Sequence, residues 1–166
     1  MNDAYRNGYR VFKSTHYVDY TKEYGAIIKL VPLGKGLICV FEHGVVYLPV
    51  NERVATSNSE GEDVYLTTNT VIPETISTVV SDTFGSQWSD SIIKTPYGIY
   101  GVDTVGKKIW VTDGTYLDCI SDFKVNKFLV DNLSLSERET SPIIGIRNVK
   151  THYNANKHDV MFTFYD

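Results

Sequence analysis

Two histidines and an aspartate flank the last predicted turn of the chain, and both residue types can bind metal ions. His152 lies before the turn, and His158 and Asp159 follow it. Zinc sites recognisable in sequence have short, regular ligand spacings. A six-residue separation across an asparagine-rich turn matches none of those spacings. We therefore interpret this segment as a polar turn and predict no metal site.

Carboxylates that could support hydrolysis occur at Asp103, Asp113 and Asp118. A glycoside hydrolase needs two carboxyl groups that face one cleft. An enzyme acting on polysaccharide is therefore a minor alternative, and it fails if these side chains point to different faces of the sheet. Ser86 and Ser91 lack the GxSxG frame of a hydrolase nucleophile. The chain also lacks the GxxxxGK[ST] frame of a phosphate-binding loop. The sequence predicts neither an enzyme nor a bound cofactor.

Four residues are candidates for contacts with a partner protein. Trp88 lies with Phe84 in a polar segment, where an exposed aromatic side chain could anchor a partner. Glu52 and Arg53 are neighbours in a polar loop and could form ion pairs at an interface. The alternatives are that the aromatic residues pack in the core and that the charges are solvated, since surface ion pairs contribute little stability.

The charge balance argues against a general nucleic-acid-binding protein. The 166 residues include 16 Lys and Arg and 20 Asp and Glu, a net charge of −4, with no run of five basic residues. A DNA-binding domain usually carries a basic patch. The 12 tyrosines suit half-buried sheet surfaces, and they also suit interfaces.

The cysteines and the termini add few constraints. Cys39 and Cys119 each lie in an apolar run, so we expect two buried free thiols. The polar N-terminus, MNDAYRNGYR, indicates no signal peptide. No stretch of 18 apolar residues occurs, so no membrane span is predicted.

Runs of β-branched and aromatic residues separated by short turns predict an all-β protein. Strands over 37–42 and 45–50 flank His43-Gly44, where glycine supplies the backbone conformation of a tight hairpin. Another strand is expected over 26–32, and shorter ones over 8–13 and 16–20.

Less regular stretches follow this hairpin. Residues 51–63 are interpreted as a polar loop. The β-branched stretch 64–80 is interrupted by Pro73, and proline lacks an amide donor. We therefore expect an edge strand or two short pieces there.

The clearest sheet in the sequence lies in the second half of the chain. Four short strands joined by tight turns are expected over 92–94, 98–103, 107–112 and 116–120. Such an up-and-down sheet is the unit of a propeller blade. The spacing of apolar residues then changes and predicts a helix from Ser121 or Asp122 to Leu133. A final strand pair is expected over 142–153 and 159–165.

A strand–turn–strand pattern recurs in the segments 36–50, 97–111 and 149–164. Their starts lie roughly 50–60 residues apart, near the spacing of long propeller blades. Three such units are fewer than the roughly four to eight blades of a closed propeller. The last apolar strand ends beside Asp166, so we expect a sheet edge that further chain or another chain covers.

Several segments resemble the tail stabilization proteins of crAss-like bacteriophages. The clearest is FGSQWSDSIIKTPYGIYGVDTVGKKIWVT at 84–112, and 119–128, 135–139 and 149–166 are also similar. The likeness covers about residues 25–166 and includes no catalytic signature. It implies a β-propeller-like virion component near the portal and tail that closes the head and keeps DNA inside. Members of that family are considerably longer than this chain.

The resemblance and the strand pattern together predict an all-β fold of consecutive antiparallel sheets, propeller-like and incomplete, with one short helix near residues 122–133. A polar N-terminal segment, 1–25, would precede a β-rich domain, 26–166, that fits a piece of a longer protein.

The expected function is structural: a component of a phage tail or neck that stabilises the portal–tail assembly and retains packaged DNA. Its expected partners are portal, ring or tail proteins and further copies of itself, assembled into the virion tail in the host cytoplasm. DNA would be near but not bound directly. The alternative is a glycan- or protein-binding β module used in host recognition.

Overall fold

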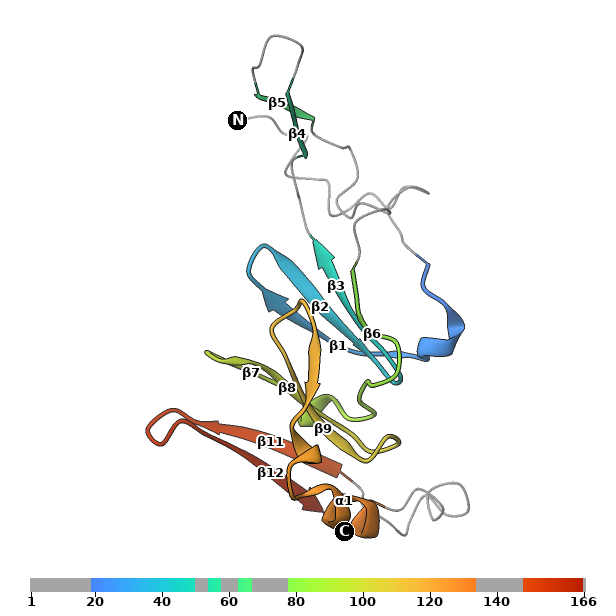
Figure 1. The fold of residues 1–166 in the computed structure, drawn as a ribbon, viewed down its shortest axis with the longest axis vertical. Coiled ribbons are helices and arrows are strands. Elements are labelled where there is room, and N and C mark those ends of the chain that lie inside the picture. The colour runs from blue at the N-terminus through green and yellow to red at the C-terminus, as the bar shows by residue number, and fades with distance from the viewer. Residues whose placement is uncertain (1–18, 50–53, 58–62, 67–77, 134–147, 166) are drawn as a thin grey trace.

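The structure, a computed structural model, consists of antiparallel sheets that follow one another along the chain (Figure 1). It describes residues 19–49, 54–57, 63–66, 78–133 and 148–165. Sheet one contains β1 (Ile27–Leu33), β2 (Gly36–Phe41), β3 (Val45–Pro49) and β6 (Thr78–Ser81), hydrogen-bonded in that order. Sheet two contains β7 (Ile93–Thr95), β8 (Gly98–Asp103), β9 (Lys108–Thr112) and β10 (Leu117–Cys119), adjacent in chain order.

Two hairpins and one helix complete the main described elements. β4 (Val54–Ser57) pairs with β5 (Asp63–Leu66), and β11 (Asn148–Asn154) pairs with β12 (Asp159–Tyr165). The helix α1 covers Asn126–Asn132, and short 3-10 helices cover Lys22–Tyr24, Ser89–Ser91 and Ile120–Asp122. A mostly β fold with antiparallel sheets and one short helix is therefore confirmed. The described residues form no closed ring of sheets.

The predicted hairpins agree with the structure because each has a tight turn between two β-forming runs. The strands expected over 26–32, 37–42 and 45–50 correspond to β1, β2 and β3. The four strands expected between residues 92 and 120 correspond to β7, β8, β9 and β10.

The helix begins later than the sequence pattern predicts. Ser121 and Asp122 were the expected caps, but the Ser121 hydroxyl accepts a hydrogen bond from the Ile109 N–H at 3.1 Å. The Asp122 carboxylate forms an ion pair with Lys108. Both side chains are therefore bound to β9. Lys124 then adopts a φ of 80°, which a continuous helix does not allow. α1 starts after this residue and has no side-chain cap.

A hairpin also lies where the sequence analysis places a polar loop. β4 falls inside the predicted loop 51–63, and β5 starts at its last residue. Each strand has four residues, too few for alternation to distinguish a strand from a loop. The stretch 64–80 contributes two separate pieces, to β5 and β6, which was one of the two alternatives.

Other expected features lie outside the described residues. They are the strand over 8–13, most of the strand over 16–20, Pro73, and the first residues of the strand predicted from 142.

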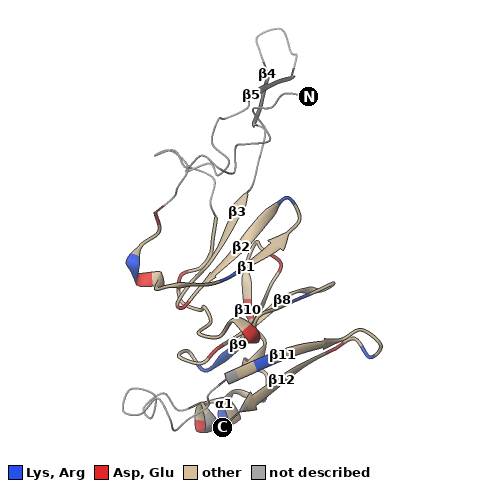
Figure 2. Ribbon diagram, turned by 180° about the vertical axis from the view of Figure 1, so that it is seen from behind, with Lys and Arg blue, Asp and Glu red and all other residues tan. Residues whose placement is uncertain are grey.

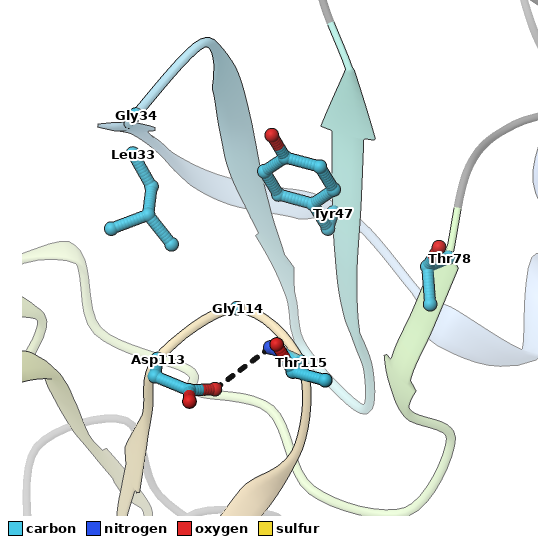
Figure 3. A pocket seen from close by; sticks show the side chains of 7 residues that line it. All are labelled: Leu33, Gly34, Tyr47, Thr78, Asp113, Gly114 and Thr115. Atoms are coloured by element: carbon cyan, nitrogen blue, oxygen red, sulfur yellow. Dashed lines mark hydrogen bonds between the residues drawn. The ribbon is translucent and has the colours of Figure 1, made fainter.

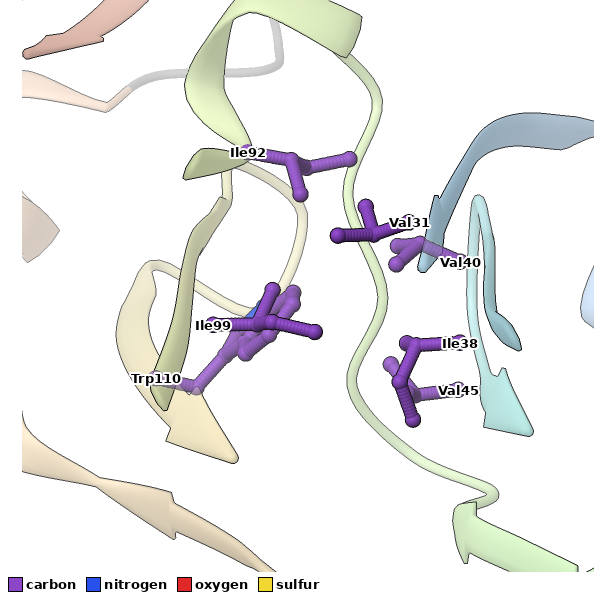
Figure 4. Close-up of a cluster of buried hydrophobic side chains, with 7 residues drawn as sticks. All are labelled: Val31, Ile38, Val40, Val45, Ile92, Ile99 and Trp110. Atoms are coloured by element: carbon purple, nitrogen blue, oxygen red, sulfur yellow. The ribbon is translucent and has the colours of Figure 1, made fainter. Parts of the chain in front are cut away.

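Sheet one, sheet two and the β11–β12 hairpin are stacked in chain order (Figure 1). The first core joins sheet one to sheet two (Figure 4) and contains Val31, Ile38, Val40, Val45, Ile92, Ile99 and Trp110. The next core joins sheet two to the hairpin and α1 and contains Val102, Ile109, Leu129, Leu133 and Val149. Sheet two serves both cores because neighbouring residues of a strand point to opposite faces.

Trp110 fixes the spacing of the strands in sheet two. It is fully buried, and it lies opposite Gly101 in the register of β8 and β9. A Cβ atom added at Gly101 would lie 2.2 Å from Cζ2 of the indole ring. The indole N–H donates to the carbonyl of Gly85 at 2.7 Å, outside the sheet. The ring therefore requires glycine at position 101.

We expect Gly101→Ala to lower the free energy of unfolding by about 1–3 kcal/mol, because the added methyl group overpacks a core beside a fixed ring. Equilibrium unfolding in urea measures the change. Lys157→Ala, an exposed change in the β11–β12 turn, serves as the control. A Gly101→Ala protein as stable as the control would show that the indole does not lie against the β8 backbone.

Candidate interaction surfaces

The connector, residues 82–92 between β6 and β7, contains both predicted aromatic anchors and is held by a buried carboxylate. Asp103, at the end of β8, is 1% exposed. Its two oxygens accept hydrogen bonds from the backbone N–H groups of Gly85, Val105 and Gly106 at 3.2, 2.9 and 2.8 Å. They also accept one from the Gln87 side chain at 3.1 Å. Buried polar groups are tolerated when they are satisfied in this way.

Gln87 extends this network to sheet one. Its amide nitrogen donates to the Glu42 carbonyl, just beyond β2, at 2.7 Å as well as to Asp103. Its amide oxygen accepts from the N–H and the hydroxyl of Thr104 at 2.8 and 2.7 Å. One side chain therefore links the end of β2 to the end of β8.

The connector serines have structural partners. The Ser86 N–H donates to the Phe41 carbonyl at 2.9 Å, and the Ser86 hydroxyl donates to the Val102 carbonyl at 2.9 Å. The hydroxyl oxygens of Ser86 and Ser91 lie 2.6 Å apart. The Ser91 carbonyl accepts a hydrogen bond from the Thr151 hydroxyl of β11 at 2.8 Å. Both serines are buried. Through these hydrogen bonds the two serines connect sheet one, sheet two and β11.

Phe84 and Trp88 are half-buried in the structure. Phe84 packs against the core between sheets one and two, and Trp88 packs against the core formed with α1 and β11. Their proposed role as partner anchors stays a prediction. Glu52 and Arg53 lie outside the described residues.

An apolar surface that the sequence analysis did not identify lies around α1. We call it the 120–130 surface, and its exposed members are Ile120, Phe123, Val125, Phe128 and Val130. Phe123 is 82% exposed, the largest value among the exposed large hydrophobic residues. Phe128 is 54% exposed and lies 6.4 Å, between ring centroids, from Phe164 of β12. Groups of large exposed apolar side chains can mark interaction sites.

β12 adjoins this surface, and its outer edge pairs with no described strand. It has seven residues, one charged residue (Asp159) and no proline, and its register with β11 is uninterrupted. The ribbon in Figure 2 shows how few charges it carries. By contrast, β1 contains Lys29 and Pro32, and β6, β7 and β10 have only three or four residues. Those are devices that protect sheet edges, and β12 lacks them.

The candidate catalytic carboxylates do not lie together. In the register of β8 and β9, Asp103 lies opposite Lys108, at the start of β9, whereas Asp113 follows the end of β9. These two carboxylates therefore share no cleft. His158 lies at the β11–β12 turn, 3.1 Å from the Tyr97 hydroxyl and 3.2 Å from that of Tyr153.

Within the described ranges, no three His, Cys, Asp or Glu side chains are grouped to hold a metal ion. No helix in the described part of the chain is long and apolar enough to cross a bilayer.

One hollow of about 420 Å³ lies between the two large sheets (Figure 3). Its walls come from the β1–β2 turn, from β3 and β6, and from the β9–β10 turn: Leu33, Gly34, Tyr47, Thr78, Asp113, Gly114 and Thr115. Its volume lies within the range usual for ligand pockets, about 300–1,000 Å³.

The described part of the chain thus combines stacked antiparallel sheets, an open edge at β12 and the exposed apolar residues of the 120–130 surface. The profile of the family described as "Crassvirus muzzle protein" matches residues 2–166, and the chain belongs to this family. It is 21% identical over 150 residues to the protein named "Muzzle protein" of Bacteroides phage crAss001. That alignment covers 90% of this chain and 10% of the relative, so the chain spans about a tenth of the relative's length.

Membership in this family relates the chain to structural proteins of crAss-like phages and is consistent with the expectation that it is not an enzyme. The predicted relation to structural proteins of crAss-like phages is confirmed. The family is that of the muzzle proteins, whereas the resemblance in the sequence pointed to the tail stabilization proteins of the same phages.

We expect Asp103→Asn to destabilise the fold by about 2–4 kcal/mol, because the amide presents N–H groups to a site already filled with donors. Asp118→Asn makes the same chemical change on exposed β10 and should stay within about 0.5 kcal/mol of the parent. Urea unfolding compares the two variants. Equal effects would mean that the carboxylate does not hold the connector.

The two free cysteines should differ in reactivity at pH 8. Burial raises the pKa of the Cys39 thiol to about 11, and the Cys39 residue is 1% exposed. Burial, with the Asp122 charge nearby, also raises the pKa of Cys119, but that side chain is only half-buried. Ellman's reagent should therefore modify Cys119 first, and Cys119→Ser should remove the faster phase. Loss of the faster phase in Cys39→Ser instead would reverse the assignment.

Proposed function

We propose that this chain is a segment of a tail component that stabilises the portal–tail assembly and helps keep packaged DNA inside the head. The observation that carries the proposal is the unprotected edge of β12 beside the exposed 120–130 surface. Together they offer backbone hydrogen-bonding groups and apolar side chains on one side of the molecule. A partner can use both by adding a strand to the sheet and covering the aromatic residues.

The sheets are proposed to be successive blades of a propeller-like array. Sheets one and two are four-stranded antiparallel units stacked in chain order, and the β11–β12 hairpin stacks next with two strands. In this arrangement the hairpin is the first half of a third blade. Its remaining strands would lie along β12, over the region where Phe128 meets Phe164.

The proposed partners are portal, ring or tail proteins and further copies of the same protein, joined in the virion after assembly in the host cytoplasm. Phe123 and Phe128 would be buried at such a contact, because large aromatic side chains dominate interface energies. DNA retention would follow from closing a channel with protein, since a chain with a net charge of −4 has no general attraction for phosphate.

The test is a phage whose gene encodes Phe123→Asp and Phe128→Asp together. We expect virions that contain roughly tenfold less of this protein, because two charges would be buried in an apolar contact. Quantitative mass spectrometry of purified particles measures the content, and nuclease protection measures the retained DNA.

Tyr116→Asp is the matched control, since Tyr116 is 59% exposed on the β9–β10 side of sheet two. Normal incorporation and normal DNA protection in the double variant would contradict the proposal. Normal incorporation with unprotected DNA would contradict the assembly contact at Phe123 and Phe128 and leave this surface a role in DNA retention alone.

A further inference from the structure

The hollow between the sheets is lined by aromatic, acidic, hydroxyl-bearing and aliphatic side chains. The Tyr47 ring of β3 forms one wall, and the turn of residues 113–115 lies opposite (Figure 3). Thr78 and Leu33 close two further sides. The lining therefore combines one tyrosine, one carboxylate, two threonine hydroxyl groups and a leucine side chain.

The aromatic wall is held in place by the strand beneath it. Tyr47 is half-buried and packs against the core between the sheets. A Cβ atom added at Gly36, on the neighbouring strand β2, would lie 2.6 Å from both Cζ and the hydroxyl oxygen of Tyr47. The ring thus lies directly over a residue without a side chain. Packing on this side restricts the ring, and a restricted side chain costs less to order on binding.

The opposite wall is also preformed. Asp113 accepts hydrogen bonds through Oδ1 from the N–H groups of Thr115 and Tyr116 at 2.8 and 3.4 Å. Gly114 has a φ of 99°, and a Cβ atom there would lie 2.5 Å from Leu33. The turn therefore lies against the Leu33 side chain of sheet one. Within the described residues, no hydrogen bond engages Oδ2 of Asp113.

This combination matches the chemistry of a neutral sugar ring. The face of a tyrosine ring is electron-rich and attracts the polarised C–H bonds of a pyranose. A carboxylate accepts strong hydrogen bonds from hydroxyl groups, and threonine hydroxyls can both donate and accept. The lining residues include no Lys, Arg or His. Phosphate and other anions therefore find no counter-charge among them.

We propose that this hollow is a binding site for a single neutral pyranose residue, with Tyr47 stacking on the ring and Asp113 accepting from its hydroxyl groups. The site lies between sheets one and two, whereas the proposed assembly contacts lie at β12 and α1. It would give a virion structural protein a weak contact with carbohydrate. The inference does not depend on the assembly role.

The test is a titration of the ¹⁵N-labelled 166-residue chain with methyl glycosides of glucose, galactose, mannose and N-acetylglucosamine. We expect saturable shifts of the Gly34, Gly114 and Thr115 amides with at least one sugar. A site of this size and openness should bind with a roughly millimolar Kd, so the titrations run to about 50 mM. Inorganic phosphate, the anion probe, should leave these amides unmoved.

Two variant pairs localise the effect. Asp113→Asn keeps the oxygen that holds the turn and removes the charge, so it should weaken binding at least about tenfold. Asp118→Asn makes the same change outside the lining and should bind as the parent does. Tyr47→Leu should abolish the saturable shifts, while Tyr116→Leu, a neighbouring exposed tyrosine, should not. Thermal unfolding confirms that each variant is folded.

Three results would overturn the inference. They are the absence of saturable shifts with all four sugars, equal weakening by Asp113→Asn and Asp118→Asn, and shifts of the same amides by phosphate. None of them bears on virion incorporation, so this proposal and the assembly role can fail separately.

Discussion

The buried carboxylate of Asp103 is the constraint on which the stacking of the sheets depends. Apolar burial between two sheets is non-directional, so a core such as that around Ile38 and Ile99 does not by itself fix how one sheet sits on the other. Hydrogen bonds are directional. Asp103 accepts hydrogen bonds from the Gly85 N–H of the connector and from the Gln87 side chain. The Gln87 side chain also donates to the Glu42 carbonyl, at the end of β2 in sheet one. The two sheets are thereby held in one relative position.

The same connector couples the second core to the first. Ser86 bonds to sheet one and sheet two, and Ser91 bonds to Ser86 and to Thr151 of β11. From the opposite side, the Lys29 ammonium group donates to the carbonyls of Ser89 and Ile92 at 2.9 and 2.8 Å. A polar stretch of sequence therefore forms hydrogen bonds with sheet one, sheet two and β11.

The sequence predicts the hairpins well and the polar network poorly, for one physical reason. Alternation and tight turns are local signals, and β2, β3, β8 and β9 carry both. The partners of Asp103 and Gln87 are set by tertiary contact, so the sequence showed the segment around Phe84 and Trp88 only as polar. The 120–130 surface was not predicted for the same reason. The spacing of its apolar residues predicted a helix, but tertiary packing decides that, of the apolar residues in this helix, only Leu129 and Leu133 are buried.

The difference between β12 and the other outer strands argues that its edge is normally covered. A seven-residue strand with one charge and no irregularity would pair with any extended chain that meets it. The other outer strands of the described sheets are short or carry lysine or proline, so this protein does protect edges that remain exposed. An edge left without protection, beside exposed Phe123 and Phe128, is the kind of edge that an added strand and an apolar partner surface would cover.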